Sequence, residues 1–142
     1  ERTAAADVWV IDDEMFALTG ISPDVIQELH KGRPRTLELQ STHNVITLAG
    51  LGPGTAIFMT SVEMEDLDPG DSGIITGIIA ISITMKRMVE FTQGYHFEER
   101  ERMSARIKVR CVGSSIVKSV THESILQPIM VEVVKSACYY AG

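Results

Sequence analysis

The run GIITGIIAISITM, residues 73–85, constrains the fold more than any other part of the chain. Its β-branched residues favour an extended strand. It is too short, and too often interrupted by threonine, serine and glycine, to supply the ~20 apolar residues of a membrane helix. Gly77 interrupts the strand where a glycine favours a bend or bulge. We therefore expect a long bent strand in a protein without a membrane segment.

Strand patterns recur along the rest of the chain. In MSARIKVRCV, small and apolar residues alternate with Ser104, Arg106, Lys108 and Arg110, as on a strand with one buried face. We expect Gly113 to turn the chain after it. Other short strands are predicted at FALTG (16–20), TLELQ (36–40), AIFMTS (56–61), SSIVKSV (114–120) and PIMVEVV (128–134).

Helix signals are fewer. In ISPDVIQELHKG, Ser22 suits the N-cap, Pro23 the first helical position and Gly32 the residue after the helix. NVITLAGL (44–51) fits either a strand or a buried helix, and THESILQ (121–127) predicts a short helical turn. The polar stretch EFTQGYHFEERERM (90–103) is expected to leave the sheet as a loop or short helix.

These patterns predict a mainly β (α+β) fold of about seven strands and two or three short helices. The chain shows neither βαβ alternation nor an internal repeat, and we expect a small, partly closed β-barrel bent at Gly54, Gly77 and Gly113. A chain of 142 residues suits a single domain spanning residues 1–142, with residues 1–14 as an extended N-terminal segment.

The net charge of −6 argues against a general nucleic-acid binder, but the charges are segregated. Acidic residues concentrate in 1–30 and 63–71, whereas 31–40 and 86–110 carry a positive surplus, which permits a local basic surface. The start of the chain lacks the pattern of a signal peptide, so a cytoplasmic location is expected.

Metal and cofactor signatures are absent from the sequence. Cys111 and Cys138 form no CxxC motif, and no two histidines have helical metal-ligand spacing. Glycine-rich phosphate motifs are missing as well. We expect no metal, no cofactor and two reduced, buried thiols.

The segment from Gly32 to Gln40, GRPRTLELQ, joins a helix end to a strand and combines Arg35 with Glu38. Together with the later LGPGT turn and GIITGIIAI, it resembles the ASCH family, relatives of the PUA RNA-binding barrel, whose mark is GxKxxExR followed by a PGD turn. Here the spacing after Gly32 is one residue longer. Arg35 replaces the family's lysine and Gln40 replaces its arginine.

This resemblance implies a PUA/ASCH-like barrel that binds RNA, or one that hydrolyses an amide of a modified nucleoside. Arg35 stays protonated and is unsuited to act as a base, which counts against hydrolysis and favours clamping an anion. The chain as a whole also resembles an archaeal family of uncharacterised proteins, through LTGIS, RTLEL, FMTSV, DPGDSGII and YHFEERERM.

The candidate site residues come from two segments: the helix-to-strand corner at residues 32–43 and the strand that carries Arg106, Lys108 and Arg110. Glu38 is the candidate general base, and its alternative role is an ion pair with Arg33 or Arg35. Tyr95, His96 or Phe97 offers a base-stacking ring beside Arg106, Lys108 and Arg110. The residues predicted to bind a ligand or RNA are Arg33, Arg35, Thr36, Gln40, His43, Tyr95, Arg106, Lys108 and Arg110.

Three functions stay open at this point. The first is binding of RNA or a nucleotide-like ligand in a cleft beside residues 32–43. The second is an ASCH-like amidohydrolase acting on a modified nucleoside. The third is a non-catalytic homo-oligomeric module, a homodimer in which GIITGIIAISITM and PIMVEVV pair between copies.

Overall fold

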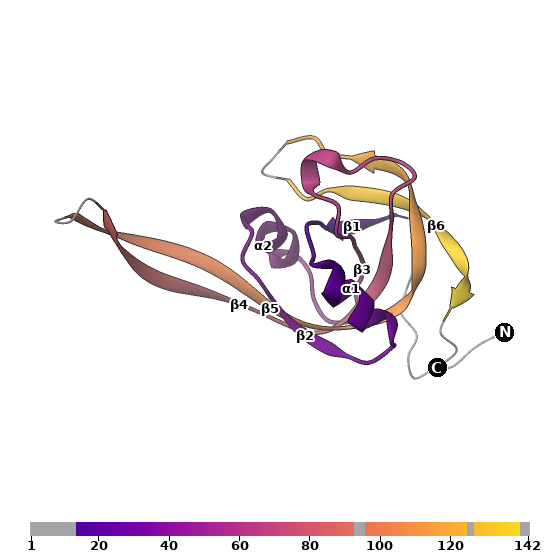
Figure 1. Cartoon of the computed structure of the whole chain (residues 1–142), viewed down its shortest axis with the longest axis horizontal. Coiled ribbons are helices and arrows are strands. Elements are labelled where there is room, and N and C mark those ends of the chain that lie inside the picture. Colours follow the sequence, from indigo (N-terminus) through magenta and orange to yellow (C-terminus); the bar gives the residue numbers. More distant parts are fainter. Residues whose placement is uncertain (1–13, 93–95, 125–126, 140–142) are drawn as a thin grey trace.

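The computed structural model describes residues 14–92, 96–124 and 127–139, and within them it is mainly β, as expected (Figure 1). Residues 1–13 and Tyr95 lie outside the described residues, and Glu14 already belongs to the first strand. The elements in chain order are β1 (Glu14–Leu18), α1 (Pro23–His30), β2 (Arg35–Leu39), α2 (Thr42–Ala49), β3 (Ala56–Met59), the 3-10 turn η2 (Met64–Asp66), β4 (Ser72–Thr92), β5 (His96–Thr121) and β6 (Met130–Tyr139).

The strands form a ring of hydrogen bonds. Their order is β2-β5-β4-β3-β1-β6, and an additional pairing of β6 with β5 closes the ring. β5 pairs with β4 along one edge, while its other edge pairs with β2 at 105–109 and with β6 at 113–121. β1 and β3 are parallel, and the other pairs are antiparallel. β2 thus lies at the outer end of this order.

Two apolar clusters fill the body. One packs α1 and α2 against the sheet through buried residues that include Leu29, Leu48 and Ile107. The other lies among the strands around Phe58 and Ile129. The strict alternation of β5 explains the first cluster, because Ile107 and Val109 are buried while Arg106 and Lys108 between them are exposed.

The predicted bends at Gly54, Gly77 and Gly113 are confirmed only in part. Gly54 has φ +90°, which suits the predicted turn, and shifts of the β4–β5 register lie on either side of Gly77. Gly113 does not turn the chain: β5 continues to Thr121, and the β5–β6 register shifts between Gly113 and Ser115. A glycine inside a strand can mark an irregular pairing as well as a turn, so the separate strand predicted at 114–120 is the second half of β5.

The stretch 90–103 was expected to leave the sheet, and this expectation is wrong. Residues 84–92 of β4 pair with residues 96–104 of β5, and this two-stranded arm projects far from the helices (Figure 1). Met85, Val89 and Met103 of the arm are exposed, and a strand pair that covers no core needs no alternation of apolar and polar residues in its sequence.

The two helix expectations around the core have different outcomes. Residues 42–49 form α2, which settles the choice between strand and helix. Of the turn predicted at 121–127, Thr121 ends β5, residues 122–124 have no regular structure, residues 125–126 lie outside the described residues, and the Gln127 N–H donates to the Ser124 carbonyl at 3.1 Å. None of the helices in the described part of the chain is long and apolar enough to cross a membrane.

Gly73 provides a test of the packing between β3 and β4. A Cβ atom at this position would collide with the carbonyl oxygen of Met59 and the ring of Phe58. We expect Gly73→Ala to lower the free energy of unfolding by about 1–3 kcal/mol, because neither neighbour can move without disturbing the core. Urea denaturation measures the loss.

Gly52→Ala is the matched control for this experiment. A Cβ atom at Gly52 would meet nothing within 4 Å, so its stability should stay within about 0.5 kcal/mol of the wild type. Equal stabilities of the two variants would show that the close approach at Gly73 is not a packing constraint.

Candidate functional site

The predicted helix-to-strand corner is present. α1 begins at Pro23 and ends at His30, Lys31 follows it, and Gly32 adopts φ +84° with its N–H donating to the carbonyl of Leu29 at 2.9 Å. This left-handed residue ends the helix and leads the chain into β2. Ser22 occupies the N-cap position, although no cap hydrogen bond from its side chain is present in the described structure.

The corner carries a local positive field. Lys31 forms an ion pair with Glu28 at 2.7 Å, and this contact is the main reason that the pKa of Glu28 lies below its usual value. The charges of Arg35 and Arg33 lower that pKa further, although by less. Both arginines are exposed, so they are accessible to an anionic ligand.

Asn44 fixes the opposite side of the corner. Its side-chain oxygen accepts from the Thr19 N–H at 3.1 Å, and its amide nitrogen donates to the Thr19 carbonyl at 2.9 Å. The backbone N–H of Asn44 in turn donates to the Ser41 hydroxyl, which caps α2. The end of β1 and the start of α2 are therefore tied together by one buried side chain.

Two adjoining cavities lie beside these elements. The first, of about 430 Å³, runs along β2 and is called the corner cleft here; it is lined by Gly20, Ile21, Ser22, Val25, Arg35, Thr36, Leu37, Glu38, Leu39, Gln40, Ser41 and Asn44. The second, of about 600 Å³, lies at the root of the arm and is lined by Gln40, Ser41, Thr42, Val45, Ile46, Glu101, Arg102 and Met103. The two meet at Gln40 and Ser41.

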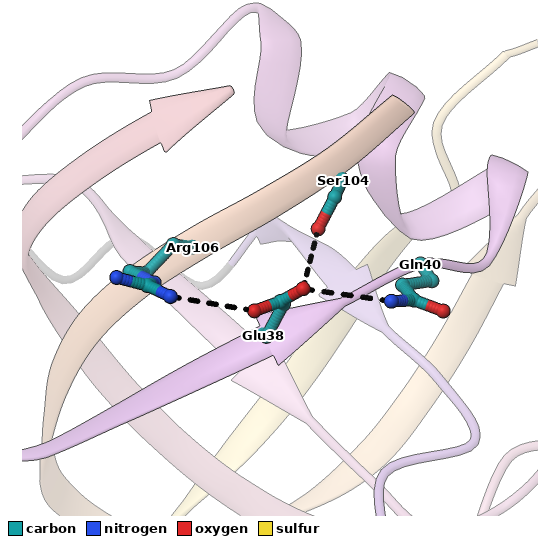
Figure 2. Close-up of polar contacts among 4 residues, drawn as sticks. All are labelled: Glu38, Gln40, Ser104 and Arg106. Atoms are coloured by element: carbon teal, nitrogen blue, oxygen red, sulfur yellow. Dashed lines mark hydrogen bonds and ion pairs between the residues drawn. The ribbon is translucent and has the colours of Figure 1, made fainter. Parts of the chain in front are cut away.

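Glu38 is the centre of a polar network that joins β2 to β5 (Figure 2). Its carboxylate accepts a hydrogen bond from the Ser104 hydroxyl at 3.1 Å and a longer one from the Gln40 amide at 3.5 Å. Arg106 forms an ion pair with it at 3.5 Å. The predicted ion pair of Glu38 thus exists, but its partner is Arg106 rather than Arg33 or Arg35.

The cationic residues of β5 lie beside the cleft. Arg106 pairs in register with Glu38, and Lys108 with Thr36, so a row of cations borders a strand that also lines the cleft. Arg110 follows on the same strand, opposite Gly77 of β4, and is partly buried. The structure therefore brings together Arg35, Thr36, Glu38, Gln40, Arg106 and Lys108, with exposed Arg33 just before β2.

His43 was predicted at this site, but it does not line either of the two cavities. It packs edge-on against His122, with ring centroids 5.7 Å apart. Burial lowers the pKa of His43, and the neighbouring His122 lowers it further. Its ring nitrogens are shielded from water and have no hydrogen-bond partner among the described residues, which favours the neutral imidazole.

The described residues hold no group of three or more histidine, cysteine or acidic side chains that suits a metal ion. Cys111 is a buried free thiol, and burial raises its pKa. It therefore behaves as a small apolar residue of the core, as expected.

Sequence reasoning missed several residues of the site. Ser104 was assigned to the exposed row of β5, but it is buried and donates to Glu38. The cap pair of Ser41 and Asn44, three residues apart, was a helix-start signal that would have assigned 42–49 to a helix. The contact of Asn44 with Thr19 has no local sequence signal, because 25 residues separate the two.

A ring of hydrogen-bonded strands with a polar cleft at a helix-to-strand corner defines the class: a small mainly β protein with a candidate ligand site. The family described as "Protein of unknown function (DUF473)" matches residues 13–131, and the chain belongs to that family.

The chain is similar to the uncharacterized protein MJ0105 of Methanocaldococcus jannaschii, at 29% identity over 112 residues, which make up 79% of this chain and 68% of that protein. This supports the expected likeness to uncharacterised archaeal proteins. Among solved structures, the N-terminal domain of the Mycobacterium avium complex Lon protease aligns with a TM-score of 0.47 and 16% identity, over 91% of this chain and 57% of that one, less than two thirds of its length.

The Asn44 contacts generate a stability prediction. Asn44→Ala leaves a buried backbone N–H and a buried carbonyl of Thr19 without partners, so we expect the free energy of unfolding to fall by about 2–4 kcal/mol. Gln40→Ala removes an exposed amide from the same corner and should cost no more than about 0.5 kcal/mol. Denaturant unfolding with similar losses for both variants would contradict the assigned role of Asn44.

The histidine pair generates a pH prediction. Because the folded state lowers the pKa of His43, the unfolded chain binds more protons once the pH falls through the unfolded value of about 6.5. Stability should therefore decrease as the pH is lowered from about 7.5 to 5.5. Thermal unfolding measures this, and His43→Gln should flatten the dependence; an unchanged slope would exclude His43 as its source.

Proposed function

We propose that the protein binds RNA or a nucleotide-like ligand in the corner cleft, with a PUA/ASCH-like mode of recognition. The single observation that supports this most directly is that β2 is shared between two features. Its residues line the cleft, and across the β2–β5 pairing they lie beside Arg106 and Lys108. A ligand in the cleft therefore meets polar groups and Arg35 of β2, and Arg106 and Lys108 lie on the neighbouring strand within reach of a ligand that extends beyond the cleft.

The chemistry of the lining suits a base together with a phosphate. Glu38, Gln40 and Ser41 supply acceptors and donors that can read the edge of a base, and Val25 and Leu39 supply partly buried apolar surface. Arg35 at the other end of the strand supplies a guanidinium that can hold a phosphate with two hydrogen bonds.

The ion pair between Arg106 and Glu38 does not prevent this role. Both side chains are partly exposed, the contact is 3.5 Å long, and a surface pair of this kind contributes only about 0–1 kcal/mol. Arg106 can therefore exchange Glu38 for a phosphate oxygen at little cost. The net negative charge of the whole chain opposes non-specific binding, so we expect affinity to depend on this local cluster.

Amide hydrolysis has less support. The proposed base, Glu38, is a hydrogen-bond acceptor for Ser104 and Gln40 and an ion-pair partner of Arg106, and its side chain is 33% exposed. This environment suits holding a ligand better than taking a proton from it. Glu38 remains a predicted catalytic residue only for that second function.

The test is a titration of fluorescent single-stranded RNA of mixed sequence, and of nucleotides, at several salt concentrations. We expect affinity for RNA to fall as salt rises, because phosphate contacts release counterions. Neutralising Arg106 and Lys108 with glutamine should weaken binding several-fold and lower the slope of log affinity against log salt by about 1 for each phosphate contact removed.

Lys118→Gln is the matched control, since it removes an exposed cation from the same strand, but from the part that pairs with β6 rather than with the cleft-lining β2. It should bind like the wild type. Binding that ignores both salt and the two cleft-side substitutions, or no binding of any RNA or nucleotide, would refute the proposal.

A further inference from the structure

The arm, residues 84–92 and 96–104, is the one large part of the described structure that the proposed function leaves unexplained (Figure 1). Beyond Ile78 the described residues of β4 pair only with β5, so along the arm the outer edge of β4 is open. Nine consecutive residue pairs, from Thr84 with Ser104 to Thr92 with His96, make up the arm.

An isolated two-stranded ribbon is marginally stable in water, and three or more strands are needed for independent stability. The arm contributes little burial of its own, because Met85 is 60% exposed, Val89 55% and Met103 44%. The ion pair of Arg87 with Glu101 is 3.7 Å long and exposed. An open edge on such a ribbon is a template for another strand.

The charges of the arm are arranged by position. Residues 84–88 and 100–104, the root, carry four cations and one glutamate, whereas residues 89–92 and 96–99, the tip, carry three glutamates and neither lysine nor arginine. The root is thus +3, the tip −3 and the arm neutral in total. A neutral arm is unsuited to a nucleic acid, but two such arms complement each other when they lie antiparallel.

Residues of like charge also occupy opposed positions in the register of the arm. The register sets Lys86 opposite Arg102 and Glu90 opposite Glu98, and directly opposed like charges destabilise a strand pair. A strand added at the β4 edge relieves both pairs if it brings a glutamate beside Lys86 and a cation beside Glu90.

We propose that the open β4 edge of the arm pairs antiparallel with the same edge of a second copy of this chain, joining two arms into a four-stranded sheet. The pairing is centred on Met88, so Lys86 of each copy lies opposite Glu90 of the other. Met85 then lies opposite Phe91 of the second copy. One symmetric register therefore pairs opposite charges at Lys86 and Glu90 and apolar residues at Met85 and Phe91. Arg87, which is ion-paired with Glu101 in its own arm, lies opposite Val89.

The other edge of the arm does not fit this arrangement. A symmetric pairing of two β5 edges centred on Arg100 sets that arginine against its own copy and Glu99 against Glu101. A pairing centred on Glu99 sets Arg100 against Glu98, but it also sets Glu99 against its own copy and Glu101 against Phe97. The strands named earlier for dimer pairing are residues 73–85 and 128–134. Within them, residues 74–77 pair with strands of their own chain on both edges and residues 130–134 pair with β1 and β5, whereas residues 84–85 already belong to the arm. The β4 edge of the arm is thus the surface that a second copy can extend.

The shared edge is about 30 Å long, and an interface limited to it is smaller than a standard protein interface of about 1,600 Å². We therefore expect a dimer that dissociates on dilution. Sedimentation velocity of the wild-type protein over a wide concentration range should show a monomer–dimer equilibrium. A monomer at every concentration would overturn the proposal.

Charge reversal tests the register. Lys86→Glu and Glu90→Lys each place like charges at two symmetric contacts and should each raise the dimer dissociation constant by about tenfold or more. Within the arm, however, each change replaces a like-charge pair by an opposite pair. Loss of the dimer is therefore not explained by a weaker arm.

Two rescue measurements complete the design. The double variant Lys86→Glu/Glu90→Lys restores both contacts in reverse and should dimerise like the wild type, and an equimolar mixture of the two single variants should form a heterodimer. If the single variants dimerise as the wild type does, or if neither the double variant nor the mixture recovers the dimer, this pairing is excluded. Circular dichroism checks that all variants are folded.

Discussion

The structure around the cleft depends on one amide side chain. Asn44 is bonded to both the N–H and the carbonyl of Thr19, so it acts as a short strand would against the end of β1. Just beyond Thr19, Gly20 and Ile21 donate to the carbonyls of Val62 and Thr60. The loop that forms one wall of the corner cleft is thus held by backbone bonds on one side and by Asn44 on the other, which sets its position relative to α2.

A second constraint is that one strand, β5, pairs with three other strands. β5 pairs with β2 and β6 on one edge and with β4 on the other, and its register shifts occur where its partners change or the sheet bends. An extra residue in one strand increases the local twist, which allows the sheet to close on itself. The closed ring gives β2 a rigid support, and β2 carries the lining of the cleft.

Much of this was predictable from the sequence, and the failures share a physical cause. The α1 helix, the strands with one buried face and the corner between Gly32 and Gln40 follow from local periodicity and turn residues. The strand structure of residues 90–103 was not predicted, because an arm that covers no core needs no alternation of apolar and polar residues. The partners of Glu38 were also missed, because Ser104 and Arg106 lie more than 60 residues away and are set by strand register alone.

The root of the arm has a mechanical consequence for the cleft. Glu101, Arg102 and Met103 belong to the arm and also line the cavity that adjoins the corner cleft at Gln40 and Ser41. Any tilt of the arm against α2 changes the shape of that cavity. If a ligand in the cavity binds more tightly to one tilt of the arm, it changes the affinity of the arm for its own partner. Thermodynamic linkage then requires that partner to change the affinity for the ligand by the same factor. A movement of the arm is therefore transmitted directly to the wall of this cavity, because the same three residues belong to both.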